Sequence, residues 1–352
     1  MTRAVAGADG ITAGFLTEVL ADQLDGAAVA AVTATGVGTG QVSDTFRLEL
    51  RYTGPAPLPA SMIAKVPAAD PDSRAAAAAF RTYEIEASFY QQLARSLPVR
   101  LAHCFYAGYD QDADEYVVLL EEHSAAVTGD QMAGLRPADA ADAVTELAAL
   151  HAAGYGRGDL AGLPWLNRSR EDGARLLAAA LERLYPGFRE RYAGELEPGT
   201  LELIEAFLPR AESYLAATDE PRTLVHGDFR ADNLLFGTGR PVVLDWQTAG
   251  YGAGLSDLSY FLASSLPVAS RRRYEEALVR HYHAELARHG VQLTWQDCWT
   301  GYRRYAFSGI VTDIIAAMGV RQAQRGDAMF ATMARRHARH ALDLDALDLL
   351  AG

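Results

Sequence analysis

Residues 223–247, TLVHGDFRADNLLFGTGRPVVLDWQ, place one histidine, three aspartates and one asparagine among short runs of valine, leucine and phenylalanine. Short apolar runs bounded by turn residues are typical of buried strands. Burying an unpaired carboxylate is unfavourable unless a cation, a metal ion or a reacting group compensates its charge. This stretch is therefore the strongest candidate in the chain for a functional site.

The acidic residues of this stretch follow its predicted strands. A strand at 223–225 leads into His226, and a hairpin over 234–244 ends at Asp245. We therefore expect Asp228, Asn233 and Asp245 to emerge close together at strand ends. Asp228 can act as a base, while the oxygens of the other two suit a hard cation. Mg²⁺ commonly takes one or two protein oxygens and completes its shell with phosphates and water.

The lysine content of the chain points to a second part of the site. The 32 basic residues include a single lysine, Lys65. Because arginine has replaced lysine elsewhere, the remaining ammonium group is a candidate for a role that a guanidinium cannot fill, with chance survival as the alternative. Lys65 lies near the end of a predicted buried strand, 61–66. Glu86 lies on the apolar stripe of a long helix predicted to run from about 71 to 97, and a buried glutamate requires a cation. We expect the two to pair.

Composition excludes several classes of protein. A chain of 352 residues is long enough for two units, and a formal charge of −13 argues against a nucleic-acid partner. No apolar run approaches the roughly 20 residues of a membrane-spanning helix. Residues 11–24 predict an amphipathic helix rather than an export signal, so we expect a cytoplasmic protein. Cys104 and Cys298 have no metal-ligand spacing and predict neither a disulfide framework nor a zinc module.

The order of predicted elements indicates two lobes. Residues 45–52 alternate polar and apolar, as a half-buried strand does, and this strand belongs to a first lobe of five strands and one long helix at 1–121. Residues 122–352 are predicted to be mostly helical. The turn at 36–43 contains Gly38, Gly40 and Ser43; its spacing fits neither a dinucleotide-binding loop nor a Walker A loop. Its backbone N–H groups could still cover phosphates, and an ordinary hairpin is the alternative.

The pattern His226-Gly-Asp228, then Asn233, then an apolar strand ending in Asp245 resembles the aminoglycoside phosphotransferase and choline kinase superfamily. These proteins are relatives of protein kinases, and the nearest branch is the ecdysteroid-kinase-like one. Further matches are 86–90 (EASFY), 119–122 (LLEE), 129–131 (GDQ), 147–151 (LAALH) and 245–247 (DWQ). They extend over nearly the whole chain. The resemblance implies an α+β, bilobal protein-kinase-like fold with a small antiparallel-sheet lobe and a larger, mostly helical lobe.

The resemblance also implies a role for each part of the pattern. Asp228 would be the catalytic base, and Asn233 and Asp245 would hold Mg²⁺ on the phosphates of ATP. Lys65, paired with Glu86, would contact the α- and β-phosphates, and the turn with Gly38, Gly40 and Ser43 would cover them. The backbone from Leu120 to Glu122 would bind adenine. His226 and Asp257 would brace the catalytic loop. Trp246 in place of phenylalanine after Asp245 departs from the protein kinases.

These observations predict an ATP- and Mg²⁺-dependent kinase of a hydroxyl group on a small molecule. A nucleotide-binding pseudokinase or regulatory module without turnover is the alternative. A kinase of protein side chains is disfavoured, because no activation segment is recognisable between Asp245 and Asp257. An aminoglycoside would require an acidic pocket, choline an aromatic cage and a steroid-like alcohol an apolar pocket. Possible walls of the acceptor pocket are Arg230, Trp165, Trp299, Tyr302 and Asp313. The sequence selects neither the acceptor nor an oligomeric state.

Overall fold

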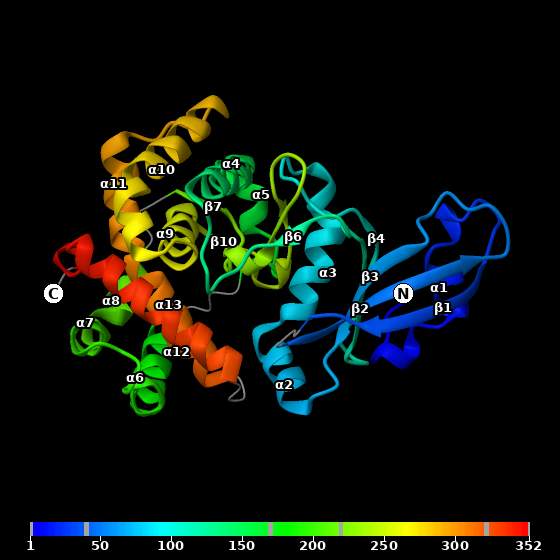
Figure 1. Cartoon of the computed structure of the whole chain (residues 1–352), viewed down its shortest axis with the longest axis horizontal. Coiled ribbons are helices and arrows are strands. Elements are labelled where there is room, and N and C mark those ends of the chain that lie inside the picture. Colours follow the sequence, from blue (N-terminus) through cyan, green and yellow to red (C-terminus); the bar gives the residue numbers. More distant parts are fainter. Residues whose placement is uncertain (1–2, 39–41, 168–171, 218–220, 320–323, 351–352) are drawn as a thin grey trace. The chain divides into compact units, whose positions relative to one another are not determined.

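The computed structural model describes residues 3–38, 42–167, 172–217, 221–319 and 324–350. The chain divides into two compact units, and Figure 1 labels their helices and many of their strands. Unit 1 comprises Met1–Leu97, Leu101–Ala125 and Leu244–Ala249, and unit 2 comprises Pro98–Arg100, Ala126–Val243 and Gly250–Gly352. Unit 1 thus contains a short segment from later in the chain, Leu244–Ala249. The predicted division into lobes at 1–121 and 122–352 assigns this segment to the second lobe. That division stays a prediction.

An antiparallel sheet of five strands, in the order β1-β2-β3-β5-β4, forms much of unit 1. The strands are β1 (Val29–Gly36), β2 (Ser43–Tyr52), β3 (Ser61–Pro67), β4 (Cys104–Asp110) and β5 (Glu115–Glu121). Lys65 on β3 is paired with Thr45 on β2 and with Val118 on β5, so the three side chains lie on one face of the sheet. Because side chains alternate along a strand, Ala64 and Val66 lie on the other face.

The face opposite Lys65 carries the apolar core of unit 1. The helix α1 (Ala13–Val19) packs near β1 (Figure 1). Its Leu16 is fully buried. This core joins the N-terminal segment to alternate residues of β2, β3 and β5, among them Leu48 and Ala64. The polar residues between them, such as Glu49, point away from it. The period of two in the sequence therefore determines which face of the sheet the N-terminal segment covers.

The single long helix predicted to run from about 71 to 97 is divided into two. Helix α2 (Pro71–Phe80) starts where the sequence indicates, because the Asp70 side chain accepts a hydrogen bond from Ser73 N at 2.9 Å. Arg81 then takes a left-handed conformation, with φ of 56°, which ends a right-handed helix. Helix α3 (Thr82–Gln92) begins at once and packs on β4 and β5. Glu86 belongs to this second helix.

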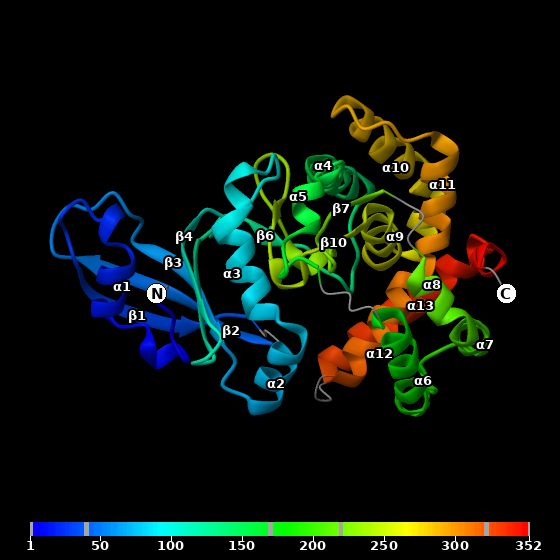
Figure 2. The same cartoon turned by 180° about the vertical axis from the view of Figure 1, so that it is seen from behind.

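Unit 2 is mostly helical. Its helices are α4 (Pro137–Gly154), α5 (Gly158–Ala161), α6 (Gly173–Tyr192), α7 (Pro198–Phe207), α8 (Ala211–Ala216), α9 (Gly254–Ser265), α10 (Val268–Arg288), α11 (Trp295–Arg304), α12 (Ser308–Gly319) and α13 (Gln324–Asp343). Helix α10 packs on α4, and α12 packs on α13 (Figure 2). Helix α9 is buried on nearly every side, which explains its apolar sequence.

Two small sheets of unit 2 carry part of the opening stretch. One pairs β7 (Arg222–Val225) with β10 (Gly250–Ala253), and the other has the order β6-β8-β9. The strands of the second are β6 (Val127–Thr128), β8 (Leu234–Phe236) and β9 (Val242–Val243). The predicted strand before His226 and the predicted hairpin over 234–244 are thus present. In the described part of the chain, no helix is long and apolar enough to cross a bilayer.

Candidate active site

Lys65 in unit 1 is held by two carboxylates. Its Nζ atom lies 2.7 Å from the Glu86 carboxylate and 2.7 Å from Asp245 Oδ1. Lys65 is only 8% exposed and Glu86 1%. Burial alone lowers the pKa of an ammonium group, but Asp245 and Glu86 outweigh it and raise the pKa of Lys65. The lone lysine is therefore positively charged at neutral pH, and its predicted pairing with Glu86 is present in the structure.

Glu86 is fixed by further contacts within unit 1. Tyr116 on β5 donates its hydroxyl hydrogen bond to Glu86 Oε2, and the backbone N–H of Trp246 donates to Oε1 at 3.3 Å. The Trp246 ring stacks on Phe89, one helical turn along α3, with 4.0 Å between ring centroids. The tryptophan that departs from the protein-kinase pattern thus locks the segment after Asp245 onto the helix that carries Glu86.

Asp245 combines a strained backbone with a partly exposed side chain. Its φ is 66°, in the left-handed region, and its side chain is 27% exposed. Its Oδ2 atom accepts a hydrogen bond from Gln247 Nε2 at 3.1 Å. Residues held in such a conformation cost about 1–3 kcal/mol each and cluster at functional sites. The carboxylate thus lies beside Lys65, and its side chain is still partly exposed to solvent.

The other predicted nucleotide-binding residues lie on or beside the same sheet. Gly38 has φ of 76°, a conformation that favours glycine. Ser43 begins β2, and Leu120 lies in β5 opposite Ile63. Glu122, just after β5, accepts a hydrogen bond from Arg47 Nε at 2.7 Å. Gly40 lies outside the described residues.

In unit 2, Asp257 holds the loop that contains Asp228. Asp257 lies in the first turn of α9 and accepts the backbone N–H groups of His226 at 2.6 Å and of Gly227 at 3.1 Å. His226 is fully buried, and its Nδ1 accepts the backbone N–H of Asp228 at 3.2 Å. Gly227 has φ of 81°, which permits the sharp turn after β7. This geometry is what the predicted bracing role of His226 and Asp257 requires.

The Asp228 carboxylate accepts three hydrogen bonds within unit 2. Tyr260 donates its hydroxyl to Oδ1 at 2.8 Å. Arg230 Nε and Asn233 Nδ2 both donate to Oδ2, each at 3.0 Å. Asn233 Nδ2 also donates to the Asp228 backbone carbonyl at 2.8 Å. Because the amide nitrogen of Asn233 faces Asp228, its carbonyl oxygen is the atom that could contact a cation. The structure therefore brings Asp228, Asn233 and Arg230 together.

Comparison with known proteins identifies the family. The model of the phosphotransferase enzyme family matches residues 33–293, more than half of the chain. The chain belongs to the phosphotransferase enzyme family. No curated protein matches it.

Solved structures of phosphotransferases share the fold. A putative aminoglycoside phosphotransferase from Ralstonia eutropha is 19% identical with a TM-score of 0.52, covering 93% of this chain and 98% of that one. An ADP-bound aminoglycoside phosphotransferase is 16% identical with a TM-score of 0.51, covering 93% and 98%. A choline/ethanolamine kinase family protein from Mesorhizobium loti is 17% identical with a TM-score of 0.51, covering 90% and 92%. The predicted protein-kinase-like α+β fold is confirmed, while the ecdysteroid-kinase-like branch stays a prediction.

The predicted acceptor-wall residues of this phosphotransferase are mostly buried. Trp165, Tyr302 and Asp313 are buried, and Trp299 is half-buried between Trp295 and Tyr302, on which it stacks. Tyr302 uses its hydroxyl to hydrogen-bond Glu275 at 2.7 Å, and Asp313 pairs with His337 at 2.7 Å. Their role as walls stays a prediction. Helical periodicity correctly indicates that these residues face inward, but it does not reveal which buried partner each one meets.

Sequence reasoning missed Tyr260, the phosphotransferase residue that hydrogen-bonds Asp228. A signal for it exists: Tyr260 follows Asp257 by three positions, so both side chains lie on one face of α9. Asp257 contacts the loop that contains Asp228, and a second polar group on that face is therefore a candidate for the same loop. His337, on which the Tyr260 ring stacks at 5.2 Å, comes from α13 and has no comparable local signal.

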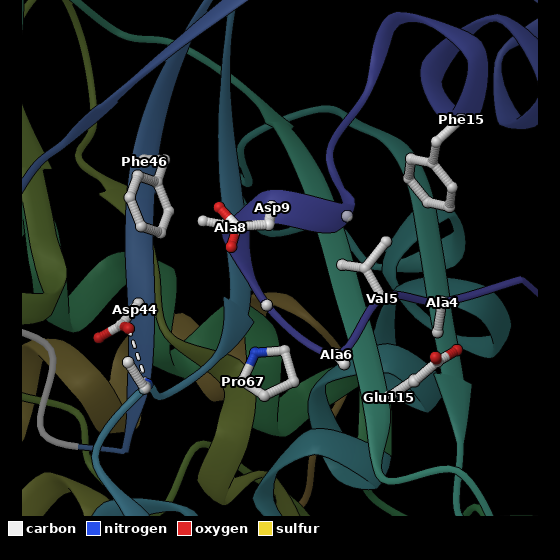
Figure 3. Close-up of a pocket in the computed structure, with 13 residues that line it drawn as sticks. Ala4, Val5, Ala6, Ala8, Asp9, Phe15, Asp44, Phe46, Pro67 and Glu115 are labelled. Atoms are coloured by element: carbon white, nitrogen blue, oxygen red, sulfur yellow. Dashed lines mark hydrogen bonds between the residues drawn. The ribbon is translucent and has the colours of Figure 1, made fainter.

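A cavity of about 670 Å³ in unit 1 lies apart from Lys65 (Figure 3). Its walls include Phe15 of α1, Phe46 of β2 and the N-terminal segment from Ala4 to Gly10. Phe46 pairs with Ala64, on the face of the sheet opposite Lys65. The cavity is therefore separate from the predicted phosphate contacts of this phosphotransferase.

Proposed function

We propose that the protein is an ATP- and Mg²⁺-dependent phosphotransferase that moves the γ-phosphoryl group of ATP to a hydroxyl of a small molecule. The observation that carries the proposal is the buried contact of Lys65 with both Glu86 and Asp245, in a chain that belongs to the phosphotransferase family. A cation held this way can bind phosphates without moving its own anchors. The ADP complex of a structural relative supports the choice of nucleotide.

Unit 1 supplies the groups for the nucleotide. Lys65 would contact the α- and β-phosphates, and Glu86 would keep the ammonium group in place. Tyr116 and Trp246 hold Glu86, so it needs no rearrangement when the nucleotide binds. The turn containing Gly38, Gly40 and Ser43 would cover the phosphates, and the backbone from Leu120 to Glu122 would bind adenine.

Asp245 and Asn233 have the donor chemistry that Mg²⁺ requires. Both offer hard oxygen atoms, and Mg²⁺ usually binds proteins through one or two such ligands together with substrate phosphates. No group of three or more histidine, cysteine, aspartate or glutamate side chains that could hold a metal ion exists in the described part of the chain. The described residues therefore do not form a metal site made of protein ligands alone. When bound, Mg²⁺ neutralises charge on the transferring phosphoryl group.

Asp228 would orient the acceptor hydroxyl and take its proton. The oxygen of the hydroxyl then forms a bond to the γ-phosphorus, and the bond from that phosphorus to the β-γ bridging oxygen breaks. The products are the phosphate ester, ADP and a proton, which Asp228 releases to water. His226 and Asp257 keep the loop of Asp228 in place through the backbone bonds of residues 226–228. A positioned base of this kind contributes about 10² to 10⁴ in rate.

The acceptor is a small alcohol. Structural relatives carry names of aminoglycoside phosphotransferases and of choline/ethanolamine kinase family proteins, and all of these substrates bear hydroxyl groups. The ecdysteroid-kinase-like resemblance adds steroid-like alcohols as a third class. Among the predicted wall residues, Arg230 is the one that directly contacts Asp228, so it is the first candidate to meet the acceptor.

A screen for acceptor-stimulated ADP release tests the proposal. Purified protein with Mg²⁺ and ATP is offered aminoglycosides, choline and ethanolamine, and steroid-like alcohols, and products are checked by mass spectrometry for one added phosphoryl group. We expect ATP with Mg²⁺ to raise the melting temperature and one class to stimulate ADP release. An Asp228→Asn variant should keep the thermal shift and lose the turnover. Nucleotide binding without turnover on any alcohol would instead support the pseudokinase.

A further inference from the structure

The hydrogen bonds at Asp228 distinguish its two carboxylate oxygens. An ionised carboxylate has about four lone-pair positions, two on each oxygen. Arg230 Nε and Asn233 Nδ2 occupy both positions on Oδ2. Tyr260 occupies one position on Oδ1 and leaves the other. The acceptor hydroxyl therefore finds an available lone pair on Oδ1, beside the Tyr260 hydroxyl.

The Tyr260 ring packs against a buried pair of side chains, His337 and Asp313. Its ring stacks on His337 with 5.2 Å between centroids and 23° between planes. His337 Nδ1 lies 2.7 Å from Asp313 Oδ2, and both side chains are at most 1% exposed. Gly309 of α12 lies directly against His337, because a Cβ atom at that position would come within 2.2 Å of the imidazole ring. Gly309 therefore limits the space on one side of the His337 ring, and the Tyr260 ring stacks on that imidazole.

We propose that Oδ1 of Asp228 is the atom that receives the acceptor proton, and that Tyr260, supported by the His337–Asp313 pair, is the positioning residue that fixes this oxygen. This inference rests on the proposed phosphotransferase function. In the transfer step the acceptor O–H bond breaks, its proton joins Oδ1, and the freed electron pair forms the bond to the γ-phosphorus. The bond from that phosphorus to the β-γ bridging oxygen breaks at the same time, and ADP leaves with its electron pair. Tyr260 gains and loses no proton; it sets the rotation of the carboxylate.

The surroundings keep the Tyr260 hydroxyl a donor. Burial, together with the negative charge of Asp228, raises the pKa of Tyr260 well above its ordinary value, and the Arg230 cation opposes this only in part. The hydroxyl therefore stays protonated throughout the neutral and mildly alkaline range. Loss of its hydrogen bond leaves the carboxylate held only at Oδ2, by Arg230 and Asn233.

The test compares Tyr260→Phe with Tyr192→Phe. Both changes remove the hydroxyl of a buried tyrosine that donates to an aspartate in unit 2, but Tyr192 donates to Asp327, at 3.1 Å. We expect Tyr260→Phe to lower kcat about tenfold, the usual size of a lost hydrogen bond to a charged group, without weakening ATP binding. Tyr192→Phe should leave both kcat and ATP affinity unchanged. Equal kcat values for wild type and Tyr260→Phe would overturn the inference.

A double-mutant cycle separates positioning from general damage. If Tyr260 acts through Asp228, Tyr260→Phe should have no further effect on the residual rate of Asp228→Asn protein. A purely structural role would lower the rate by the same factor in both backgrounds and would contradict the proposal. If the wild-type protein transfers no phosphoryl group to any alcohol, the proposed function itself is wrong. If the wild type is active and Tyr260→Phe has the same kcat, only the role of Tyr260 is wrong.

Gly309→Ala reaches the same network without removing any polar group. The added methyl group must displace the His337 ring, so Tyr260 loses its support and kcat should fall several-fold with ATP affinity unchanged. Gly319→Ala on the same helix is the control, because a Cβ atom there would meet nothing within 4 Å. An unchanged kcat in folded Gly309→Ala protein would remove the His337–Asp313 pair from the proposal. This variant also carries the test if Tyr260→Phe fails to fold.

Discussion

Two buried ionic clusters, one in each unit, use similar groups but are built differently. The Lys65 cluster (Lys65, Glu86 and Asp245) joins a strand, a helix and a loop of unit 1. The Glu275 cluster joins helices α10, α11 and α13 of unit 2. Its members are Arg271, Glu275, Tyr302, His340 and Asp343. Both contain a buried cation that contacts two carboxylates.

The difference lies in backbone strain and in exposure. Asp245 has a left-handed backbone and a side chain that is 27% exposed, so part of the Lys65 cluster remains available to a ligand. Glu275 and Arg271 lie one turn apart on a regular helix, and Glu275 also contacts Tyr302 and His340. Removing one partner from a closed, buried cluster destabilises a fold, whereas strained residues cluster at functional sites, which supports the binding role that we propose for Asp245.

The largest expected effect comes from removing one charge from each cluster by an isosteric change. If Asp245 is the metal ligand that we propose, Asp245→Asn should lower kcat about 10³-fold, because charge neutralisation on the phosphoryl group would lose its support. Asparagine tolerates the left-handed conformation, and the side chain of Asp245 is 27% exposed against 10% for Glu275, so the melting temperature should fall less than in Glu275→Gln protein. Glu275→Gln should show the opposite result, with kcat within about twofold of wild type by the ADP-release assay and a lower melting temperature. The comparison fails if both variants lose activity to the same extent.

The next effect concerns stability alone. Glu275→Ala should lower the free energy of unfolding by about 3 kcal/mol, because it leaves the buried Arg271 guanidinium with one carboxylate fewer. The neighbouring Glu276→Ala is the matched control: Glu276 pairs with Arg280 at the surface, where such pairs contribute less than about 1 kcal/mol. Urea unfolding followed by circular dichroism measures both. Similar losses in the two variants would mean that the Glu275 cluster does not hold the helices together.

Local patterns in the sequence account for much of the site. The pairing of Lys65 with Glu86 could be predicted because a single lysine and a glutamate on an apolar stripe both required an explanation. Asp228 and Asn233 could be placed close together because both follow strand ends. The division of the long helix at Arg81 could not be predicted, since no glycine or proline marks it. The partners of Tyr302 and Asp313 could not be predicted either, because periodicity shows that a side chain faces inward but not which helix it contacts.

Lys65→Arg tests whether the Lys65 cluster requires the shape of an ammonium group as well as its positive charge. A guanidinium is larger and planar, and Lys65 Nζ already lies 2.7 Å from two carboxylates in a buried position. We expect ATP affinity to fall about tenfold, measured by titration calorimetry with Mg²⁺ present. Arg136→Lys, at an exposed pair with Asp139, should leave affinity unchanged. Wild-type affinity and turnover in Lys65→Arg protein would show that the single lysine is an accident of composition.

The smallest expected effect is a pH dependence that belongs to the Glu275 cluster. Burial opposes ionisation of Glu275, but the hydrogen bond and charge of His340, with the charge of Arg271, lower its pKa to about 2 from an ordinary value of 4.5. The stabilisation is complete above the ordinary value and is lost as pH falls toward 2, because the unfolded chain then binds the proton more readily.

Between pH 7 and pH 4 this difference corresponds to a loss of about 1 kcal/mol in the free energy of unfolding. Glu275→Gln protein lacks the titrating group, so its unfolding free energy should fall less than that of the wild type over the same interval. Urea unfolding at both pH values gives the two losses, and their difference isolates the contribution of Glu275 from that of the other acids. Equal losses would show that the pKa of Glu275 is the same in the folded and unfolded chain, and that its partners do not stabilise the charged form.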